Sequence, residues 1–539
     1  MIIKNGTVYD PANNINGDKM DIFVEKGKIV DESELKERKE INASGLVVLP
    51  GGVEIHTHIA GSKVNIARIM RPEDHRKDVV KKTPYKRSGT GYTVPTTFTT
   101  GYRYAEMGYT TVWEAAAPPL GARHSHEELM DIPIVDKGIF TLMGSNYFVL
   151  KYTEEGEFEK LKNFVAWLLH ATKGYAVKIV NPGGVESWKW GKNVNSLDDT
   201  VQHFNVTPRE ILKNLARAAD ELHLPHSIHI HCNNLGSPGN YAITKETIEM
   251  LAPYRRHITH IQFNSYAGED WGTFASGGSD IAAVLNRSEN VTCDVGQVIF
   301  GDATTMTADG PWQHTLFKLS GNKWANSDVE METGAGIVPY KFKKKNVVNA
   351  IQWSIGLEVL LLTKDPYKVF LTTDHPNAGP FYFYPQVMEL LMSKKKREEM
   401  LEKVHPLVKE RSVLPSIERE YTLFDLAVVT RAGTAKALGM TAKGHLGVGA
   451  DADISIYNFD EENVQKSFQK ATYTIKDGVV VVKEGDVVAD YMGRTYVLDI
   501  KADLSEEEKQ IFSKYYTVQF ANYAVEDAYL PRKEVVTCA

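Results

Sequence analysis

Residues 46–58 read LVVLPGGVEIHTH, and this stretch decides the fold. Five apolar residues lead through Gly51 and Gly52 into two histidines separated by one residue. Side chains alternate between faces along a strand, so His56 and His58 project from the same side, roughly 7 Å apart. Two imidazoles at a strand end can bind one divalent metal ion, or they can be ordinary surface histidines. The rest of the chain has to decide between these readings.

Size and composition describe a globular enzyme-sized protein. The chain has 539 residues, of which 42% are hydrophobic and 24% charged. This length predicts one large domain with a smaller one. The net charge of -7 argues against a nucleic-acid partner, because phosphate binding needs a basic face.

Targeting and redox signals are sparse. The N-terminus has no signal peptide, and no apolar run approaches the ~18 residues of a membrane span, so we expect a cytoplasmic protein. Cys232, Cys293 and Cys538 are scattered, whereas an iron–sulfur cluster needs about four thiolates. Any iron–sulfur chemistry would therefore belong to a partner subunit.

Both ends of the chain have β-strand character. β-forming residues cluster around glycine turns in segments 2–9 and 21–30. The same pattern of strand, turn and strand recurs in segments 444–457 and 472–482. We therefore predict a composite β-sandwich from residues 1–50 and 441–500, followed by a C-terminal extension over 501–539.

The middle of the chain, residues 51–440, alternates short apolar strands with helical patterns, as expected for βα units around a parallel sheet. The fold class is thus α/β, a (β/α)8 TIM-like barrel whose site should lie at the C-terminal strand ends. Helices are expected at 208–222, 347–363 and 386–403. The connections 59–108 and 297–346 are too long for plain loops and are expected to cover the barrel mouth or contact partners. The eight expected strands are 52–58, 109–116, 139–145, 175–180, 226–232, 257–262, 290–296 and 368–374.

Ligand-type residues recur on these strands. Lys178 lies within apolar strand four, where an unpaired charge is costly. It could form an ion pair across the barrel, or carry carbon dioxide as a carbamate that bridges two cations.

The later strands add histidines and a carboxylate. Strand five offers His229 and His231 on one face; His231 is nearer the strand end, but the choice between them stays open. On strand six, His260 lies deeper in the apolar run than His257. Asp374 ends strand eight, where a carboxylate can bind metal and accept a proton. Five of eight strands thus carry a ligand-type residue at a comparable place.

This set resembles the metal-dependent amidohydrolase superfamily. The segment 435–440 followed by 444–453 also looks like that superfamily's return into its β-sandwich. The resemblance implies two zinc ions bridged by an N6-carboxylated Lys178. His56, His58 and Asp374 would hold one ion, and His231 and His260 the other.

A closer resemblance lies in segments that common amidohydrolases lack. These segments look like the family of the amidohydrolase-type subunit of formylmethanofuran dehydrogenase: 59–76, 121–128, 179–184, 231–236 and 373–381. That family implies an enzyme that joins formate to the amine of methanofuran, with Asp374 as acid–base group. Formate would come from carbon dioxide reduction on partner subunits, which would carry a tungsten or molybdenum pterin and iron–sulfur clusters.

Substrate-binding residues are harder to predict. Five polar loop residues are reasonable substrate or supporting groups, although each could equally be an ordinary loop residue: His124, His126, Asn233, Asn234 and Asn377.

Three rival functions stay open at this point. One is a hydantoinase- or dihydroorotase-like cyclic amide hydrolase, which the absence of an arginine directly after His58 disfavours. The second is the hydrolytic subunit of a formyltransferase/hydrolase complex that releases formate. The third is a catalytically silent scaffold, which the intact ligand set disfavours.

Overall fold

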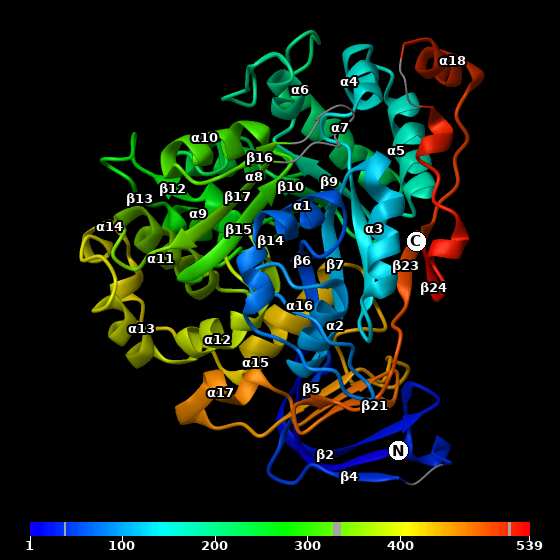
Figure 1. The fold of residues 1–539 in the computed structure, drawn as a ribbon, viewed down its shortest axis with the longest axis vertical. Coiled ribbons are helices and arrows are strands. Elements are labelled where there is room, and N and C mark those ends of the chain that lie inside the picture. The colour runs from blue at the N-terminus through cyan, green and yellow to red at the C-terminus, as the bar shows by residue number, and fades with distance from the viewer. Residues whose placement is uncertain (37–38, 327–335, 516–518, 539) are drawn as a thin grey trace.

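The computed structural model describes residues 1–36, 39–326, 336–515 and 519–538. Its centre is a barrel of eight parallel strands (Figure 1). These are β6 (Gly52–Thr57), β7 (Tyr109–Ala117), β8 (Asp136–Leu142), β9 (Ala176–Val180), β10 (Ile228–His231), β11 (Arg256–Ile258), β14 (Val291–Asp294) and β18 (Val369–Phe370). Each pairs with the next in parallel register. The predicted fold class is confirmed.

The barrel closes between its first and last strands. Thr57 of β6 forms a parallel bridge with His375, and the His58 N–H donates to the His375 carbonyl at 2.7 Å. Because His58 is itself a predicted ligand, the closure fixes the backbone that carries it.

Of the strands that end before their expected ends, two fall shortest. β11 stops at Ile258 and β18 at Phe370, although strands were expected to reach residues 262 and 374. His260 and Asp374 have φ of 34° and 46°, a left-handed conformation that cannot continue a strand ladder. His260 therefore lies just beyond the strand end, not deep in it as predicted.

Helices cover the outside of the barrel. α7 (Pro208–Glu221) begins with a capping box between Thr207 and Glu210, and α11 (Val347–Leu362) is buried along nearly its whole length. Both match the expected ranges. The third expected helix, 386–403, is divided into two helices, α12 (Tyr384–Met392) and α13 (Lys394–Leu401). The division lies at Ser393, whose side chain caps the start of α13.

The two chain ends meet in one nine-stranded mixed sheet below the barrel in Figure 1. The junction is the antiparallel pair of β5 (Val47–Pro50) and β19 (Ile454–Tyr457). Its buried residues form their own apolar cluster, with Ile3, Val8, Ile454 and Ile475 among them. The other strands are β1 (Ile2–Asp10), β2 (Ile15–Glu25), β3 (Lys28–Val30), β4 (Glu40–Asn42), β20 (Tyr473–Lys476), β21 (Val479–Lys483) and β22 (Asp486–Val487).

The last segment returns to the barrel. β23 (Thr495–Asp499) pairs with β8 and with β24 (Lys533–Thr537), so it extends the barrel's sheet and not the end sheet. Between them, α18 (Glu506–Tyr515) lies at the top of the same side (Figure 1). No helix among the described residues is both long and apolar enough to cross a membrane.

The two long connections pack against each other. The first contains α1 (Ser62–Met70) and α2 (Thr97–Glu106). The second contains β15 (Gly301–Thr307), α10 (Gly310–Ser320) and β17 (Gly336–Phe342). Val64, Ala67 and Val94 of the first share an apolar cluster with Met306 and Ile337 of the second.

A buried ion network joins the barrel to the end sheet. Asp136 begins β8, and the Lys443 Nζ lies 2.5 Å from both its Oδ2 and the Asp453 Oδ2. The Lys476 Nζ lies 3.0 Å from Asp136, and the Arg494 Nη2 lies 2.6 Å from Asp451. The four carboxylates of this network, which include Asp477, are spaced closely enough for a metal ion, but lysine ammonium groups already lie among them.

The network predicts acid sensitivity. Burial alone would raise the pKa of Asp136, but Lys443, Lys476 and Arg494 outweigh it and hold the pKa well below its ordinary value. The unfolded carboxyl has a pKa of about 3.9, so the stabilisation is complete above about pH 4 and is lost as the pH falls further. Asp136→Asn should cost about 3–5 kcal/mol at pH 7, because it removes one partner of a buried pair. This cost should shrink below about pH 4.

Thermal unfolding followed by circular dichroism between pH 7 and 3 measures both effects. Asp490→Asn, at an exposed position, is the control and should stay within about 0.5 kcal/mol of the wild type. A cost for Asp136→Asn no larger than for Asp490→Asn would contradict a stabilising role.

Candidate metal centre

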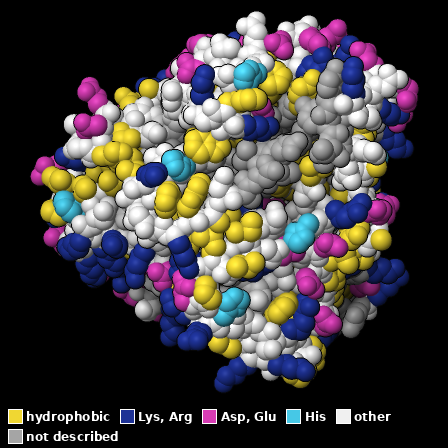
Figure 2. Space-filling model, turned by 45° about the horizontal axis from the view of Figure 1, so that its top comes forward, with side chains coloured by type: hydrophobic (Ala, Val, Ile, Leu, Met, Phe, Trp, Pro, Cys, Tyr) yellow, Lys and Arg dark blue, Asp and Glu magenta, His cyan; other side chains and the backbone are white. Residues whose placement is uncertain are grey.

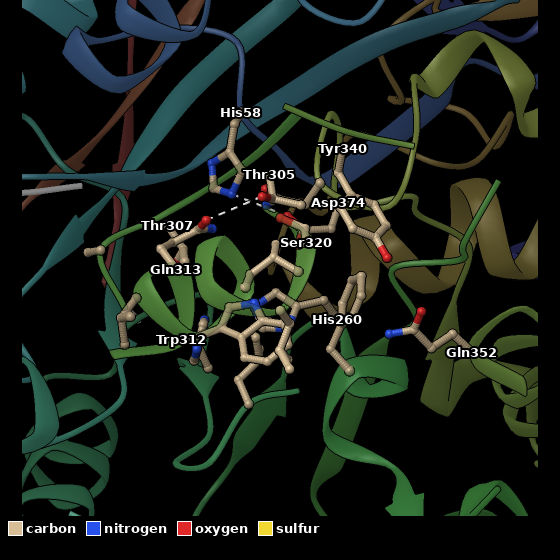
Figure 3. Close-up of a pocket in the computed structure, with 18 of the residues that line it drawn as sticks. His58, His260, Thr305, Thr307, Trp312, Gln313, Ser320, Tyr340, Gln352 and Asp374 are labelled. Atoms are coloured by element: carbon tan, nitrogen blue, oxygen red, sulfur yellow. Dashed lines mark hydrogen bonds and ion pairs between the residues drawn. The ribbon is translucent and has the colours of Figure 1, made fainter. Parts of the chain in front are cut away.

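The predicted ligands converge at the C-terminal end of the barrel. Five of them line one pocket of about 280 Å³: His58, Lys178, His231, His260 and Asp374. His56 lies at its floor, with its Nε2 2.9 Å from the Asp374 Oδ1. Figure 3 shows His58 and Asp374 facing each other, with their Nε2 and Oδ1 atoms 3.2 Å apart.

His58 is oriented by Glu114, which projects from β7. The His58 Nδ1–H donates to the Glu114 Oε1 at 3.1 Å, since a carboxylate can only accept. The N–H groups of Ile59 and Ala60 donate to its other oxygen at 2.7 and 2.9 Å. Burial alone would raise the pKa of Glu114, but the effects of Lys63 and His58 outweigh that of burial and lower the pKa to about 2. The hydrogen bond to Glu114 uses the His58 Nδ1, so the Nε2 is the nitrogen that faces the pocket, where it can serve as a metal ligand.

Several buried polar atoms at this place have no hydrogen-bond partner among the described residues. They are the His56 Nε2, the His260 Nδ1, the Lys178 Nζ and the Asp374 Oδ1. Leaving such atoms unpaired in an interior costs about 1–3 kcal/mol each. A cation would satisfy the lone pairs of the imidazole nitrogens and the carboxylate together, and that of Lys178 once its amine is uncharged or carboxylated, so the residues present fit a metal centre. His56, His260 and Asp374 also place ligand atoms within 4.8 Å of one another.

Lys178 is 1% exposed, in register with His229 on the neighbouring strand. Burial lowers its pKa to about 7, although Asp294 and Asp374 oppose this shift. Near neutral pH much of the side chain is therefore an uncharged amine, which is the form that adds to carbon dioxide. The alternative, a direct ion pair across the barrel, is not formed among the described residues.

The open choice on strand five now has a geometric answer. His231 lines the pocket, and its Nε2–H donates to the Asp309 Oδ2 at 3.0 Å. His229 lies below it inside the barrel, between His226 and His56. Of these two histidines, His231 is the one that faces the pocket and could contact a metal ion there.

The predicted substrate-binding residues separate into two groups. Asn377 lines the pocket, and the Asn233 Nδ2 donates to Asn181, which in turn donates to Asp309. Of the five, Asn377 is the one among the described residues that lines the pocket, and three of the others make their contacts elsewhere. His124 is exposed beside Asn65, His126 is buried with its Nε2 on the Thr172 carbonyl, and the Asn234 side chain donates to the Asn195 carbonyl.

Several contributors were not predicted. Glu114 and Asp294 each sit inside a strand, where one acidic residue gives no pattern, and Asp309 lies in a long connection. Asp294 accepts from the His257 Nε2 at 2.9 Å and the His260 N–H at 2.8 Å, and so holds the turn that carries His260. Lys63 lies in the segment 59–76, but no sequence pattern distinguished it from its neighbours. Its Nζ donates to the Ala116 carbonyl at 2.6 Å, beside the pocket.

The pocket wall is largely aromatic and aliphatic. Leu235, Phe263 and Trp271 come from the barrel loops; Trp312, Leu316 and Tyr340 come from the 297–346 connection. Figure 3 places Trp312 and Tyr340 at this wall. The 297–346 connection thus supplies much of the wall, as expected for a segment over the barrel mouth, and the 59–108 connection contributes Lys63.

Comparison with known proteins gives the family. The sequence model of the amidohydrolase family matches residues 39–482. The chain belongs to this family. Protein FwdA of Methanocaldococcus jannaschii is 51% identical across 98% of this chain and 97% of its own length. The corresponding subunit of the formyltransferase/hydrolase complex Fhc of Methylorubrum extorquens is 37% identical across 98% and 97%.

Structural comparison agrees with the sequence comparison. The crystal structure of that complex (FhcABCD) with methylofuran contains a chain that superposes with a TM-score of 0.95 at 36% identity. The match covers 100% of this chain and 99% of the other. Dihydroorotase of Aquifex aeolicus, by contrast, matches only 62 residues, 11% of this chain. The resemblances drawn from the motifs are confirmed, and the chain is a hydrolase-type enzyme subunit.

Gly296 supplies a test of the site's packing. Its φ is +67°, and a Cβ there would lie 2.7 Å from the His260 Cβ. Gly296→Ala should therefore displace His260 and lower the amount of divalent metal bound per chain, in addition to a stability loss of about 1–3 kcal/mol. Gly321 has φ of +65° with nothing within 4 Å of such a Cβ, so Gly321→Ala isolates the backbone strain.

Metal analysis by mass spectrometry and thermal unfolding of both variants makes the comparison. We expect metal loss only in Gly296→Ala. Equal metal content in the two variants would show that contact with His260 is unimportant.

Proposed function

We propose that this chain is the amidohydrolase-type subunit of a formylmethanofuran dehydrogenase. It condenses formate with the amine of methanofuran to formylmethanofuran, and catalyses the reverse hydrolysis. The observation that carries the proposal is the set of unpaired buried polar atoms around Lys178 and Asp374, which opens into an apolar pocket. The methylofuran in the crystal structure of the related Fhc complex supports the substrate class.

The proposed metal content is two zinc ions. His56, His58 and Asp374 would hold one, His231 and His260 the other, and a carboxylated Lys178 would bridge them. Such a pair supplies polarisation of a carbonyl oxygen and acidification of water, the two requirements of amide hydrolysis. The set of imidazole and carboxylate ligands suits zinc.

Asp374 is the proposed proton carrier. In hydrolysis it accepts a proton from the attacking water as the new C–O bond forms. It then passes that proton to the amine nitrogen as the formyl C–N bond breaks, so that formate and free amine leave. The reverse sequence forms the amide. Its Oδ1 lies at the pocket and lacks a hydrogen-bond partner among the described residues, as an exchanging group requires.

The pocket wall suits the proposed amine. Aromatic side chains such as Phe263, Trp312 and Tyr340 offer flat apolar surfaces to a furan ring. Lys63 places a cation beside Glu114 at the pocket, 3.4 Å from its Oε1, where it can steer an anion such as formate.

Partner subunits complete the proposal. The three cysteines are free, and Cys232 and Cys293 are buried. The tungsten or molybdenum pterin and the iron–sulfur clusters that reduce carbon dioxide would therefore lie on other chains. Exposed hydrophobic residues of the 59–108 connection, Ile69, Val79 and Tyr85, are suited to such contacts. Hydrophobic side chains also gather in patches on the face shown in Figure 2.

A second candidate is the hydrolytic subunit of a formyltransferase/hydrolase complex, which would release formate without a reducing partner. The high structural similarity to the Fhc chain favours it. Both candidates use the same site and differ in their partners. The short dihydroorotase match gives less support to a cyclic amide hydrolase.

Lys178→Ala tests the metal bridge. We expect zinc per chain to fall and formylmethanofuran hydrolysis to drop by more than about a hundredfold. Even the loss of a residue that only hydrogen-bonds a metal ligand lowers metal affinity or activity by about 10–100-fold. Added propionate should restore part of both, because a free carboxylate can fill the space of the carbamate.

Lys137→Ala is the matched control. Lys137 is also buried, with a pKa that burial lowers to about 7, but its Nζ donates to the Ile132 carbonyl away from the pocket. This variant should lose stability and keep its zinc per folded chain. Wild-type zinc content and hydrolysis in Lys178→Ala would refute the carbamate.

Purification of the native assembly separates the two candidate functions. A co-purifying subunit with tungsten or molybdenum and iron–sulfur clusters is the expected result. Co-purification with a formyltransferase alone would instead favour the hydrolytic complex. Mass spectrometry and metal analysis of the same sample identify both.

A further inference from the structure

A line of hydrogen bonds runs through the barrel interior below the metal centre. The His226 Nδ1 lies 2.7 Å from the Ala437 carbonyl oxygen, and the His226 Nε2 lies 3.0 Å from the His229 Nδ1. The His229 Nε2 in turn lies 2.8 Å from the His56 Nδ1. The fourth contact is that of the His56 Nε2 with Asp374 at 2.9 Å. Three imidazoles therefore connect a backbone carbonyl to the proposed ligand set.

These imidazoles are uncharged. All three are 0% exposed, and burial disfavours the charged form of an imidazole. Two carboxylates lie near this line. The Asp374 Oδ1 is 2.9 Å from the His56 Nε2, although no hydrogen bond joins these two atoms. The Asp294 Oδ2 is 3.7 Å from the His56 Nδ1 and 3.8 Å from the His229 Nε2, and it already accepts from His257 at 2.9 Å. Each ring then carries one N–H and one bare nitrogen.

The carbonyl determines which nitrogen carries the proton. A carbonyl oxygen only accepts, so the His226 Nδ1 carries the proton and its Nε2 is bare. The bare Nε2 must receive a proton from the His229 Nδ1, which leaves the His229 Nε2 bare. The His56 Nδ1 must then donate to His229, and the His56 Nε2 is left with a free lone pair. With one proton on each ring, each step follows from the one before.

The surroundings agree with this assignment. Ala437 is the last residue of α16 (Gly433–Ala437), and carbonyls of a final helical turn lack partners within their helix. The Thr259 Oγ1 is also in contact with the His56 Nδ1, and its hydroxyl can accept a share of that N–H. His58 receives the same tautomer from Glu114, so both histidines of the first strand present a bare Nε2.

We propose that His226 and His229 are positioning residues that fix the tautomer of His56 and aim its Nε2 lone pair at the metal centre. Neither residue lines the pocket, and neither contacts the proposed substrate. The inference rests on the proposed metal site but not on the identity of the amine or on the reaction direction.

The tautomers can be measured directly in the unsubstituted full-length chain. Long-range nitrogen–proton NMR correlations of metal-free protein labelled with ¹⁵N histidine distinguish protonated from bare ring nitrogens. Single histidine substitutions assign the signals. We expect a protonated Nδ1 and a bare Nε2 on His56, His229 and His226. A bare Nδ1 on His56 would overturn the proposal without recourse to any variant's stability.

Zinc affinity tests the consequence. His229→Leu should weaken zinc binding by about 10–100-fold, measured by competition with a chelator of known affinity. His229→Gln returns an acceptor oxygen near the place of the Nε2 and should recover part of this loss. His226→Leu should weaken binding by a smaller factor, although it touches no proposed ligand. The absorption spectrum of the cobalt-substituted protein should change in His229→Leu and return towards the wild type in His229→Gln.

His126→Leu is the matched control. His126 is equally buried and also contacts a backbone carbonyl, the Thr172 oxygen at 3.0 Å, but it lies on α3 (Ala122–Asp131), outside the line. Its zinc affinity should stay within about twofold of the wild type. Equal zinc loss in His126→Leu and His229→Leu, or wild-type affinity in His229→Leu, would refute the proposal. Normal zinc binding without formylmethanofuran hydrolysis by the wild type would refute the proposed function and leave this inference intact.

Discussion

The cost of burying ionisable side chains is the constraint on which this structure depends. The barrel interior holds Lys178, histidines from β6, β10 and β11, and the carboxylates Glu54, Glu114 and Asp294, all of them buried. In most barrels of this type apolar side chains fill this space. Here each polar group needs a partner, and the pairing decides which nitrogen or oxygen is left over. The leftover atoms collect at the C-terminal strand ends, where the pocket opens.

The two ends of the barrel pair their charges in opposite ways. At the N-terminal end, Asp136 is surrounded by Lys443, Lys476 and the Arg494 backbone, so its oxygens are fully used. At the other end, Lys178 and Asp374 are also a lysine and an aspartate, but they make no such pair. A satisfied network contributes stability, whereas unpaired groups cost stability and are retained where a ligand satisfies them. The paired lysine and aspartate groups at the N-terminal end of the barrel therefore stabilise the fold, whereas the unpaired ones at the C-terminal end are suited to bind a ligand.

The sequence predicted the barrel, its eight strands and the residues that converge at its mouth. These predictions could be made because a short apolar strand and the polar residue that follows it are both visible within a few consecutive residues of the sequence. The strand-six argument named His260 for the wrong reason, because a positive φ, which no local pattern reveals, ends the strand before it. His124 and His126 do not line the pocket, and the sequence could not show this, because a polar residue in a helix such as α3 gives no sign of which side faces the pocket. Glu114, Asp294 and Asp309 were missed since their partners are distant in sequence.

The division between barrel and connections explains how one polar set can serve different substrates. The proposed ligands sit on strands held by closure at Thr57 and His375 and by hydrogen bonds such as that of Glu114. The apolar wall, in contrast, comes largely from the 297–346 connection, which packs on α1 but adds no strand to the barrel. Changes among the apolar residues of that connection, such as Trp312 and Leu316, can reshape the wall, whereas Asp309 of the same connection holds His231 and is tied to the ligand set. The short similarity to dihydroorotase and the full-length similarity to the FwdA and Fhc relatives are consistent with this separation. Selection for a particular amine would therefore act on the connections, while selection for amide chemistry would act on the strand ends.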